Sequence, residues 1–428
     1  MRRLLNFGPW LLGYRGIPYM SRPTFRHEII STIFLGVGYG ILTPEFCQLF
    51  AKKTLKAEPW LVAALMAQLA LGFLFGAFLG PYFRRRRRIP YIVGGRLIIA
   101  VVMLGIALLP PTRQSRIPYV ALLLLPALLG AVIINALSSI WHSNYPSEVR
   151  GQIFSRRFII YMSIAAISIK LAGYALDEWA WAHRLIYSVG AACMVASALA
   201  IAKVRVRGER GILRSEKAEP VSPLEGFRLL ARDREYARFM AWQFLSGSMV
   251  LLTLPAIILM LDDRLGVNYA EGTTALVLVP VAVSLLAAPF LGRLFDTVGI
   301  MRLRALGAAS WATSKVVLFF GIASRSWPLV LAAFVLVGLG KGSGGLAFHI
   351  GHTHFTRPKE TQVYMGIHMT LAGLRELTMP FLGVWLYLMP QIGTRLLLIA
   401  AAIQFVAAIG FTLSPTPKIQ NGEPTHQG

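Results

Sequence analysis

Long apolar blocks alternate with short charged segments along the whole chain. A helix needs about 20 apolar residues to cross a bilayer, and twelve runs approach that length. We predict spans at 29–50, 60–82, 91–110, 117–140, 156–176, 183–203, 239–261, 272–294, 303–323, 327–350, 363–386 and 391–414. The pattern therefore predicts an all-α polytopic membrane protein with twelve transmembrane helices.

The longest polar stretch follows the sixth span and divides the spans into six plus six. We therefore predict two six-helix bundles joined by one linker. The expected segments are a cytosolic N-terminal arm at 1–28, an N-terminal bundle at 29–203, a cytosolic linker at 204–238, a C-terminal bundle at 239–414 and a cytosolic tail at 415–428.

The composition supports a membrane protein. The 428 residues are 56% hydrophobic and 14% charged, whereas an average soluble domain is roughly 25% charged. Such a chain lacks the polar side chains that a soluble surface needs, which excludes a soluble enzyme, a disordered chain and a disulfide scaffold. The two cysteines, Cys47 and Cys193, lie inside apolar blocks and lack the spacing of metal ligands.

The net charge of +24 orients the chain. Lys and Arg concentrate in alternate loops, as the positive-inside rule expects, so we predict no nucleic-acid partner. Both termini are expected in the cytoplasm, in a cell membrane, with a bacterial inner membrane favoured. Lys52, Lys53 and Lys56 are the exceptions, because they lie on the predicted outer side. The five arginines from Arg84 to Arg88 are expected to contact anionic membrane lipids.

An internal repeat is visible at an offset of about 211 residues. The matched positions are 78–83 with 290–295, Pro44 with Pro255, His142 with His352, and Gln152 with Gln362. Two halves of the same topology predict a parallel repeat, related by a pseudo-twofold axis along the membrane normal.

The loop after the eighth span carries a signature. The run G-R-L-F-D-T-V-G from Gly292 to Gly299, followed by Arg302, resembles the G-x-L-x-D-x-x-G loop of the major facilitator superfamily. The first copy keeps Gly80 but has Arg84 where the aspartate belongs. The resemblance covers about residues 25 to 415.

This resemblance implies a secondary active transporter that moves a small solute by alternating access of two six-helix bundles. It implies a gating role for the motif residues Gly80, Gly292, Asp296, Gly299 and Arg302. The subfamily is not identified. A multidrug/proton efflux antiporter is an alternative, although span 4 lacks the arginine and span 5 the glycine-rich run usual in such antiporters. A transport-dead sensor is another alternative.

Ionisable groups inside spans are costly, and they usually face a cavity or one another. Lys170, Lys341 and Arg375 are the cations that we predict to bind the substrate. Glu45 and Glu376 are the acids well inside the predicted spans, and one of them is expected to carry a coupled proton. Because these cations exceed the acids by one, the balance favours a small organic anion as the solute.

A histidine cluster is the basis of a further alternative. His349, His352 and His354 could hold a metal ion, since imidazole suits zinc or iron, which would allow a metal-dependent membrane-embedded enzyme. The cluster lies at the predicted cytosolic mouth without a carboxylate set, so a gate or interface role is favoured. We predict no enzyme activity, no metal and no cofactor. The expected partners of a monomer are a small-molecule substrate and, where transport is coupled, protons.

Overall fold

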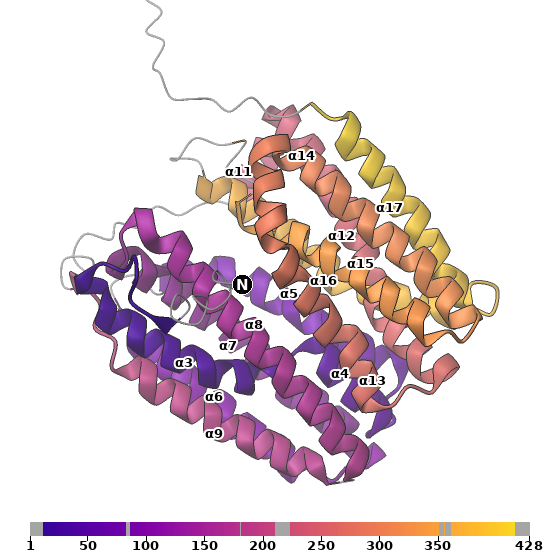
Figure 1. The fold of residues 1–428 in the computed structure, drawn as a ribbon, viewed down its shortest axis with the longest axis horizontal. Helices are drawn as coiled ribbons and strands as arrows, with labels where there is room; N and C mark the ends of the chain where they lie inside the picture. The colour runs from indigo at the N-terminus through magenta and orange to yellow at the C-terminus, as the bar shows by residue number, and fades with distance from the viewer. Residues whose placement is uncertain are drawn as a thin grey trace, which may run out of the picture. The chain divides into compact units, whose positions relative to one another are not determined.

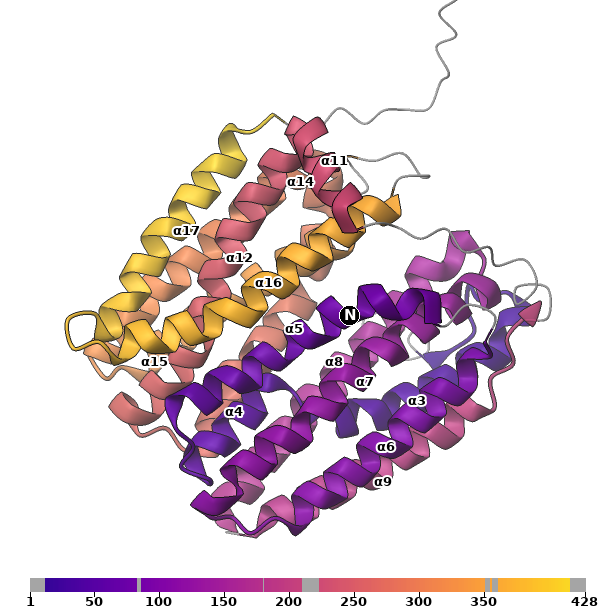
Figure 2. The same ribbon diagram turned by 180° about the vertical axis from the view of Figure 1, so that it is seen from behind.

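A computed structural model describes residues 12–82, 86–179, 181–209, 223–350, 355 and 361–415. Within these residues every regular element is a helix (Figures 1 and 2). The first half holds α3 (Arg22–Gly40), α4 (Pro44–Lys53), α5 (Pro59–Tyr82), α6 (Arg88–Leu108), α7 (Arg116–Asn144), α8 (Ser147–Glu178) and α9 (Ala182–Ala202). The second half holds α11 (Pro223–Arg232), α12 (Arg234–Met260), α13 (Tyr269–Thr273), α14 (Val279–Ala323), α15 (Trp327–Ile350), α16 (Thr361–Leu388) and α17 (Leu396–Leu413). The all-α prediction is confirmed.

All twelve predicted spans fall on helices. α3 and α4 together form the first span, and α14 runs through both the eighth and the ninth. In the part of the chain that the structure describes, ten helices are long and apolar enough to cross a membrane by length and composition. The protein is a multi-pass membrane protein.

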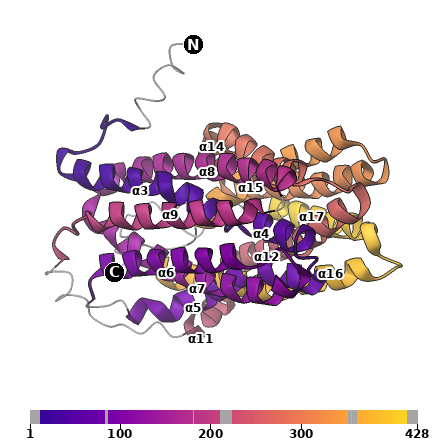
Figure 3. The ribbon, with the colours of Figure 1, turned by 90° about the horizontal axis from the view of Figure 1, so that it is seen from below.

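Helices of the first half pack side by side (Figure 3). α3 contacts both α8 and α9, and α6 contacts α9 and α7. The approach of α3 to α8 depends on glycine: a Cβ at Gly36 would lie 2.9 Å from Cβ of Ile164, and one at Gly40 would lie 3.0 Å from Cα of Ala165. Small residues at these positions allow the close helix packing that membrane bundles use.

The chain forms two compact units. The first comprises Met1–Pro220, Leu251–Ala282 and Gly373–Thr394, and the second comprises Val221–Val250, Val283–Ala372 and Arg395–Gly428. The first unit therefore joins the first half of the chain to two segments of the second half: one that runs from the end of α12 through α13, and one at the end of α16. The six-plus-six division into bundles stays a prediction.

Two helices begin earlier than the sequence predicts. α3 begins at Arg22 rather than at residue 29, and α8 begins at Ser147 rather than at 156. The helices extend beyond the predicted spans. The hydropathy window of the first span stops short of the charged Glu28, which the fold buries beside Arg157. Glu28 consequently lies inside α3. Arg157, which the fifth predicted span already contained, lies inside α8, and both are buried.

A buried cation on the third span of the first half connects three helices. Arg96 on α6 donates to the carbonyl oxygen of Ser197 on α9 at 3.0 Å, and also to the hydroxyl of Ser31 on α3. A charged group away from water needs such partners inside the protein. Arg96 thus ties the first, third and sixth spans together.

The second half repeats this arrangement with other residues. Lys315, on the ninth span, donates to the Gln404 side-chain oxygen on α17 at 2.6 Å and to the Trp311 carbonyl at 3.2 Å. The Gln404 amide donates in turn to Ser246 on α12 at 3.2 Å. The seventh, ninth and twelfth spans are therefore tied as the first, third and sixth are.

This network predicts an order of stabilities. Gln404→Leu should destabilise the protein by about 1–3 kcal/mol, because it leaves the buried Lys315 ammonium without its side-chain acceptor. Adding Lys315→Met should restore stability, since an apolar side chain of similar length needs no acceptor. The measurement is the midpoint of thermal unfolding in detergent. A midpoint unchanged by Gln404→Leu alone would contradict the role of this contact.

The turn between the eighth and ninth spans predicts a glycine requirement. Gly299 interrupts the helical backbone of α14 with φ 77° and ψ 174°, a conformation almost confined to glycine. Gly299→Ala should therefore lower the unfolding midpoint, since such strain costs on the order of 1–3 kcal/mol. Gly292→Ala is the matched control, because a Cβ at Gly292 would meet no atom within 4 Å. Equal midpoints for both variants would contradict the assignment.

Candidate functional site

A fully buried carboxylate lies at the centre of a polar cluster in the first compact unit. Glu28 on α3 accepts a hydrogen bond from the indole of Trp141 at 3.0 Å and another from the hydroxyl of Tyr145 at 2.7 Å. Nε of Arg157 on α8 lies 3.7 Å from the same carboxylate. Donors from three segments of the chain thus converge on one acid.

The local structure explains this convergence. Thr32 lies one turn after Glu28 on α3, and its hydroxyl accepts from Nε of Arg157 at 3.3 Å. The guanidinium of Arg157 also lies 4.6 Å from the ring centroid of Trp141, within cation–π range. Tyr145 follows α7 directly. Burial and the neighbouring Glu28 carboxylate raise the pKa of Tyr145, so its phenol keeps the proton that it donates.

A cavity of about 270 Å³ adjoins this cluster. Its lining comes from α3, α7 and α8, and it includes Arg157 as its charged residue. Aromatic side chains form much of the wall: Tyr39, Trp141, Phe154, Phe158 and Tyr161. A second cavity of about 310 Å³ shares Trp141, Phe154 and Arg157 with the first. The arrangement can hold a small molecule that has an apolar body and one anionic group.

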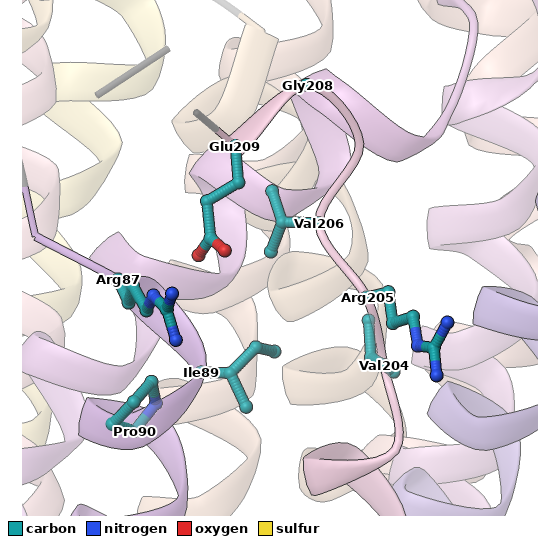
Figure 4. Close-up of a pocket in the computed structure, with 8 residues that line it drawn as sticks. All are labelled: Arg87, Ile89, Pro90, Val204, Arg205, Val206, Gly208 and Glu209. Atoms are coloured by element: carbon teal, nitrogen blue, oxygen red, sulfur yellow. The ribbon is translucent and has the colours of Figure 1, made fainter. Parts of the chain in front are cut away.

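A different cavity, of about 590 Å³, lies where the chain enters α6 and leaves α9 (Figure 4). Figure 4 shows the guanidinium of Arg87 and the carboxylate of Glu209 facing the same space, while the guanidinium of Arg205 turns away. Arg87 belongs to the basic run that we expect to contact lipids. Arg84 and Arg85 lie outside the described residues.

Lys170, a predicted substrate ligand, bonds to the second half of the chain. Its ammonium donates to the Ala270 carbonyl at 2.7 Å and to the hydroxyl of Thr274, and it lies 4.2 Å from the Tyr174 ring centroid. The structure thus places Lys170 in a contact between α8 and the start of the eighth span.

The other predicted ligands lie on several elements. Glu45 is half-buried in the first turn of α4, just after the break in the first span. Arg375 and Glu376 are neighbours on α16, and both are buried. Lys341 is half-buried on α15, in the second compact unit. Their roles in substrate and proton binding stay predictions.

The motif residues have different surroundings. Gly80 lies in α5, Gly292 lies in the helical part of α14, and Gly299 forms its turn. Arg302 is exposed. The side chain of Asp296 lies outside the described part of the structure.

The predicted histidine cluster also falls mostly outside what the structure describes. His352 and His354 are not among the described residues, and of His349 only the helical backbone is described. Among the described residues, no group of three or more His, Cys, Asp or Glu is placed to hold a metal ion.

An ionic cluster joins the two halves of the chain within the first compact unit. Lys52 at the end of α4 lies 2.8 Å from Asp263, and Lys53 lies 3.0 Å from Asp262. Tyr387 on α16 donates to Asp263 at 3.2 Å. Lys52 and Asp263 are 211 residues apart, which is the offset of the internal repeat. Equivalent positions of the two halves therefore carry opposite charges and meet.

A helix cap reinforces this end of the unit. The two carboxylate oxygens of Asp177, at the end of α8, accept from the backbone amides of Tyr269 and Ala270 at 2.8 and 2.7 Å. These amides open α13, where a negative charge is stabilised by the unpaired N–H groups. Lys170 also bonds to α13, through the Ala270 carbonyl, so two side chains of α8 contact this short helix.

Comparison with known proteins identifies the class of fold. No protein-family model matches the sequence, and no curated protein matches it. The nucleoside transporter NupG superposes with a TM-score of 0.69 at 13% identity, covering 92% of this chain and 98% of that one. The xylose transporter XylE from E. coli, in a partially occluded inward-open conformation, superposes with a TM-score of 0.68 at 12% identity. The match covers 95% of this chain and 100% of that one. A POT family transporter in complex with 5-aminolevulinic acid superposes with a TM-score of 0.72 at 13% identity. The match covers 96% of this chain and 98% of that one.

These likenesses confirm the predicted fold. The chain has the all-helical fold of major facilitator transporters over nearly its whole length. All three structures are described as transporters. At such low identities the likeness concerns the fold, and the subfamily is not identified.

Sequence reasoning missed Glu28 and Arg157. It took Glu45 and Glu376 as the acids inside the spans, because the first span was started one residue after Glu28. The signal that locates Glu28 is Pro23, which occupies the first turn of α3. Proline is favoured there, so a helix start near Arg22 places Glu28 almost two turns inside.

Proposed function

We propose that this protein is a secondary transporter that moves a small solute across a membrane by alternating access. The observation that carries the proposal is the ionic cluster of Lys52, Lys53, Asp262 and Asp263, which joins equivalent ends of the first and seventh spans. A carrier of this fold must separate those ends to admit solute on one side and rejoin them to release it on the other.

The strength of these contacts suits a gate. Solvent-accessible ion pairs contribute about 0–1 kcal/mol each, and the Asp263 side chain is 40% exposed. Together with the Asp177 cap and the Lys170 contact, these pairs would stabilise the closed gate by a few kcal/mol. A ligand that prefers one state can shift an equilibrium of that size.

The charges of the cluster also fit the proposed orientation. Lys52 and Lys53 are basic residues on the side that the positive-inside rule assigns to the exterior. Their contacts with Asp262 and Asp263 explain why lysines are retained there. We therefore place this gate on the outer side, with both termini in the cytoplasm of a cell membrane.

The solute is proposed to be a small organic anion, and its transport to be coupled to protons. The sequence assigns Lys170, Lys341 and Arg375 to the solute and Glu45 and Glu376 to the proton, and these assignments remain predictions. The fold neighbours are described as handling a nucleoside, xylose and 5-aminolevulinic acid, and solutes of that size suit the proposed carrier. Anionic lipid headgroups are proposed to occupy the cavity beside Arg87.

The gate predicts two conformations that differ at this end of the protein. Spin labels are attached at Trp60→Cys and Arg264→Cys, which are exposed positions. Cys47 and Cys193 are replaced by alanine, so that the distance between the two labels reports the separation of the halves at the gate. Pulsed-EPR measurement in proteoliposomes should give a short and a long distance. Asp262→Asn with Asp263→Asn should increase the long-distance population severalfold.

The matched control breaks an ion pair inside one half. Glu58 and Arg116 lie 2.6 Å apart within the first half, so Glu58→Gln should leave the two populations unchanged. A single distance that neither change affects would contradict alternating access and favour a rigid sensor. A thermal-shift screen of metabolites on the purified protein would then identify candidate solutes.

A further inference from the structure

The cavity between α3, α7 and α8 has the size of a compact ligand. Its volume is about 270 Å³, whereas a cavity of about 150 Å³ is enough to hold benzene. One aromatic ring with an attached acidic group therefore fits. Phe154 and Phe158 stack on one side at a centroid distance of 6.3 Å, and both remain partly exposed toward open space. A flat apolar ring can cover these faces.

One charged group is accessible from this cavity. Arg157 lines it and retains 11% exposure, whereas Glu28 behind it has none. The guanidinium is held in place by the Trp141 ring and the Thr32 hydroxyl. A planar, positioned guanidinium is suited to bind a carboxylate or a similar anionic group through paired hydrogen bonds.

The buried charges around the cavity carry a positive excess. The ionisable groups facing Glu28 are Tyr145 from the loop after α7, Arg157 from α8 and Arg96 from α6. Adjacent residues of α3, Ser31 and Thr32, hold the two arginines. With Tyr145 neutral, two cations face one carboxylate. An anion entering the cavity would neutralise the excess.

An exchange at Arg157 keeps the charge of the site constant. If a ligand anion takes the place of Glu28 beside Arg157, Glu28 loses its counter-ion and becomes costly as a buried anion. A proton from water that binds a carboxylate oxygen of Glu28 removes this cost. Trp141 can still donate to the protonated acid. One anion and one proton then enter together, and no net charge is added within the membrane.

We propose that this cavity binds a compact aromatic or similarly apolar organic anion, which displaces Glu28 from Arg157 while Glu28 takes up one proton. The proposal rests on the transport function proposed above and specifies its solute class. It assigns the proton to Glu28 rather than to Glu45 or Glu376, and the anion contact to Arg157.

The test uses benzenesulfonate as the probe, because it stays anionic across the working pH range and only the protein can titrate. Binding of radiolabelled benzenesulfonate to purified full-length protein in detergent should be saturable. The affinity should rise as the pH falls, by up to about tenfold per pH unit, the limit for uptake of one proton. Benzenesulfonamide, a neutral analogue of the same shape, should bind at least tenfold more weakly.

Variants separate the roles of the two residues. Glu28→Gln imitates the protonated acid, so it should bind the probe tightly and without pH dependence. Arg157→Gln should weaken binding at least tenfold. Ile134→Trp fills the cavity from α7 without altering a charge, and it should also block binding. Glu58→Gln, which disrupts the peripheral pair with Arg116, should retain wild-type affinity and pH dependence.

Results that refute the binding site differ from results that refute the transport function. The proposal is overturned if benzenesulfonate does not bind saturably, if benzenesulfonamide binds equally well, or if Glu28→Gln keeps the pH dependence. In proteoliposomes, an acid exterior should drive probe accumulation by wild type, whereas Glu28→Gln should exchange the probe without accumulating it. Binding without any transport would uphold the site and refute the carrier. Two EPR distances without benzenesulfonate binding would uphold the carrier and refute the site.

Discussion

Buried cations hold the helices of each half together, because lipid offers a charged group no partner. Arg96 bonds to the spans that begin and end the first half, and Lys315 does the same in the second half through Gln404. Each cation lies on the third span of its half, but the two cations do not occupy equivalent positions of the repeat. Both halves thus use a buried cation to tie three spans together, with different residues. Each tie fixes three spans of one half against one another.

The ion pair between the halves is more exposed than the buried cations inside them. Lys52 and Asp263 are partly exposed and occupy equivalent positions of the repeat. A symmetric repeat would bring identical side chains together near its axis, and like charges there would repel. The opposite charges show that the two copies have diverged where they meet. A partly exposed pair separates at small cost, which suits the proposed gate.

Hydropathy alone predicted the twelve spans, because each span must present apolar side chains to lipid over a fixed thickness. The loop signature singled out Gly299, and the structure adds that the helical backbone is interrupted there. Glu28 was missed because the hydropathy window of the first span begins one residue after its charge. The partners of Lys170 were not predicted. One is the Ala270 carbonyl, and a backbone acceptor has no residue type that a sequence pattern could reveal; the other is the hydroxyl of Thr274.

One helix carries residues of both the candidate site and the proposed gate. α8 carries Arg157 beside the cavity, Lys170 thirteen residues later and Asp177 near its end, a separation of about 20 Å and then a further 10 Å at 1.5 Å per residue. Its 32 residues contain no proline, so a tilt at one end is transmitted along the axis. Moving Arg157 toward a ligand anion would shift Lys170 and Asp177 against the segment that begins with α13. In the proposed carrier, α8 would therefore be the rigid element that links the ligand site to the gate.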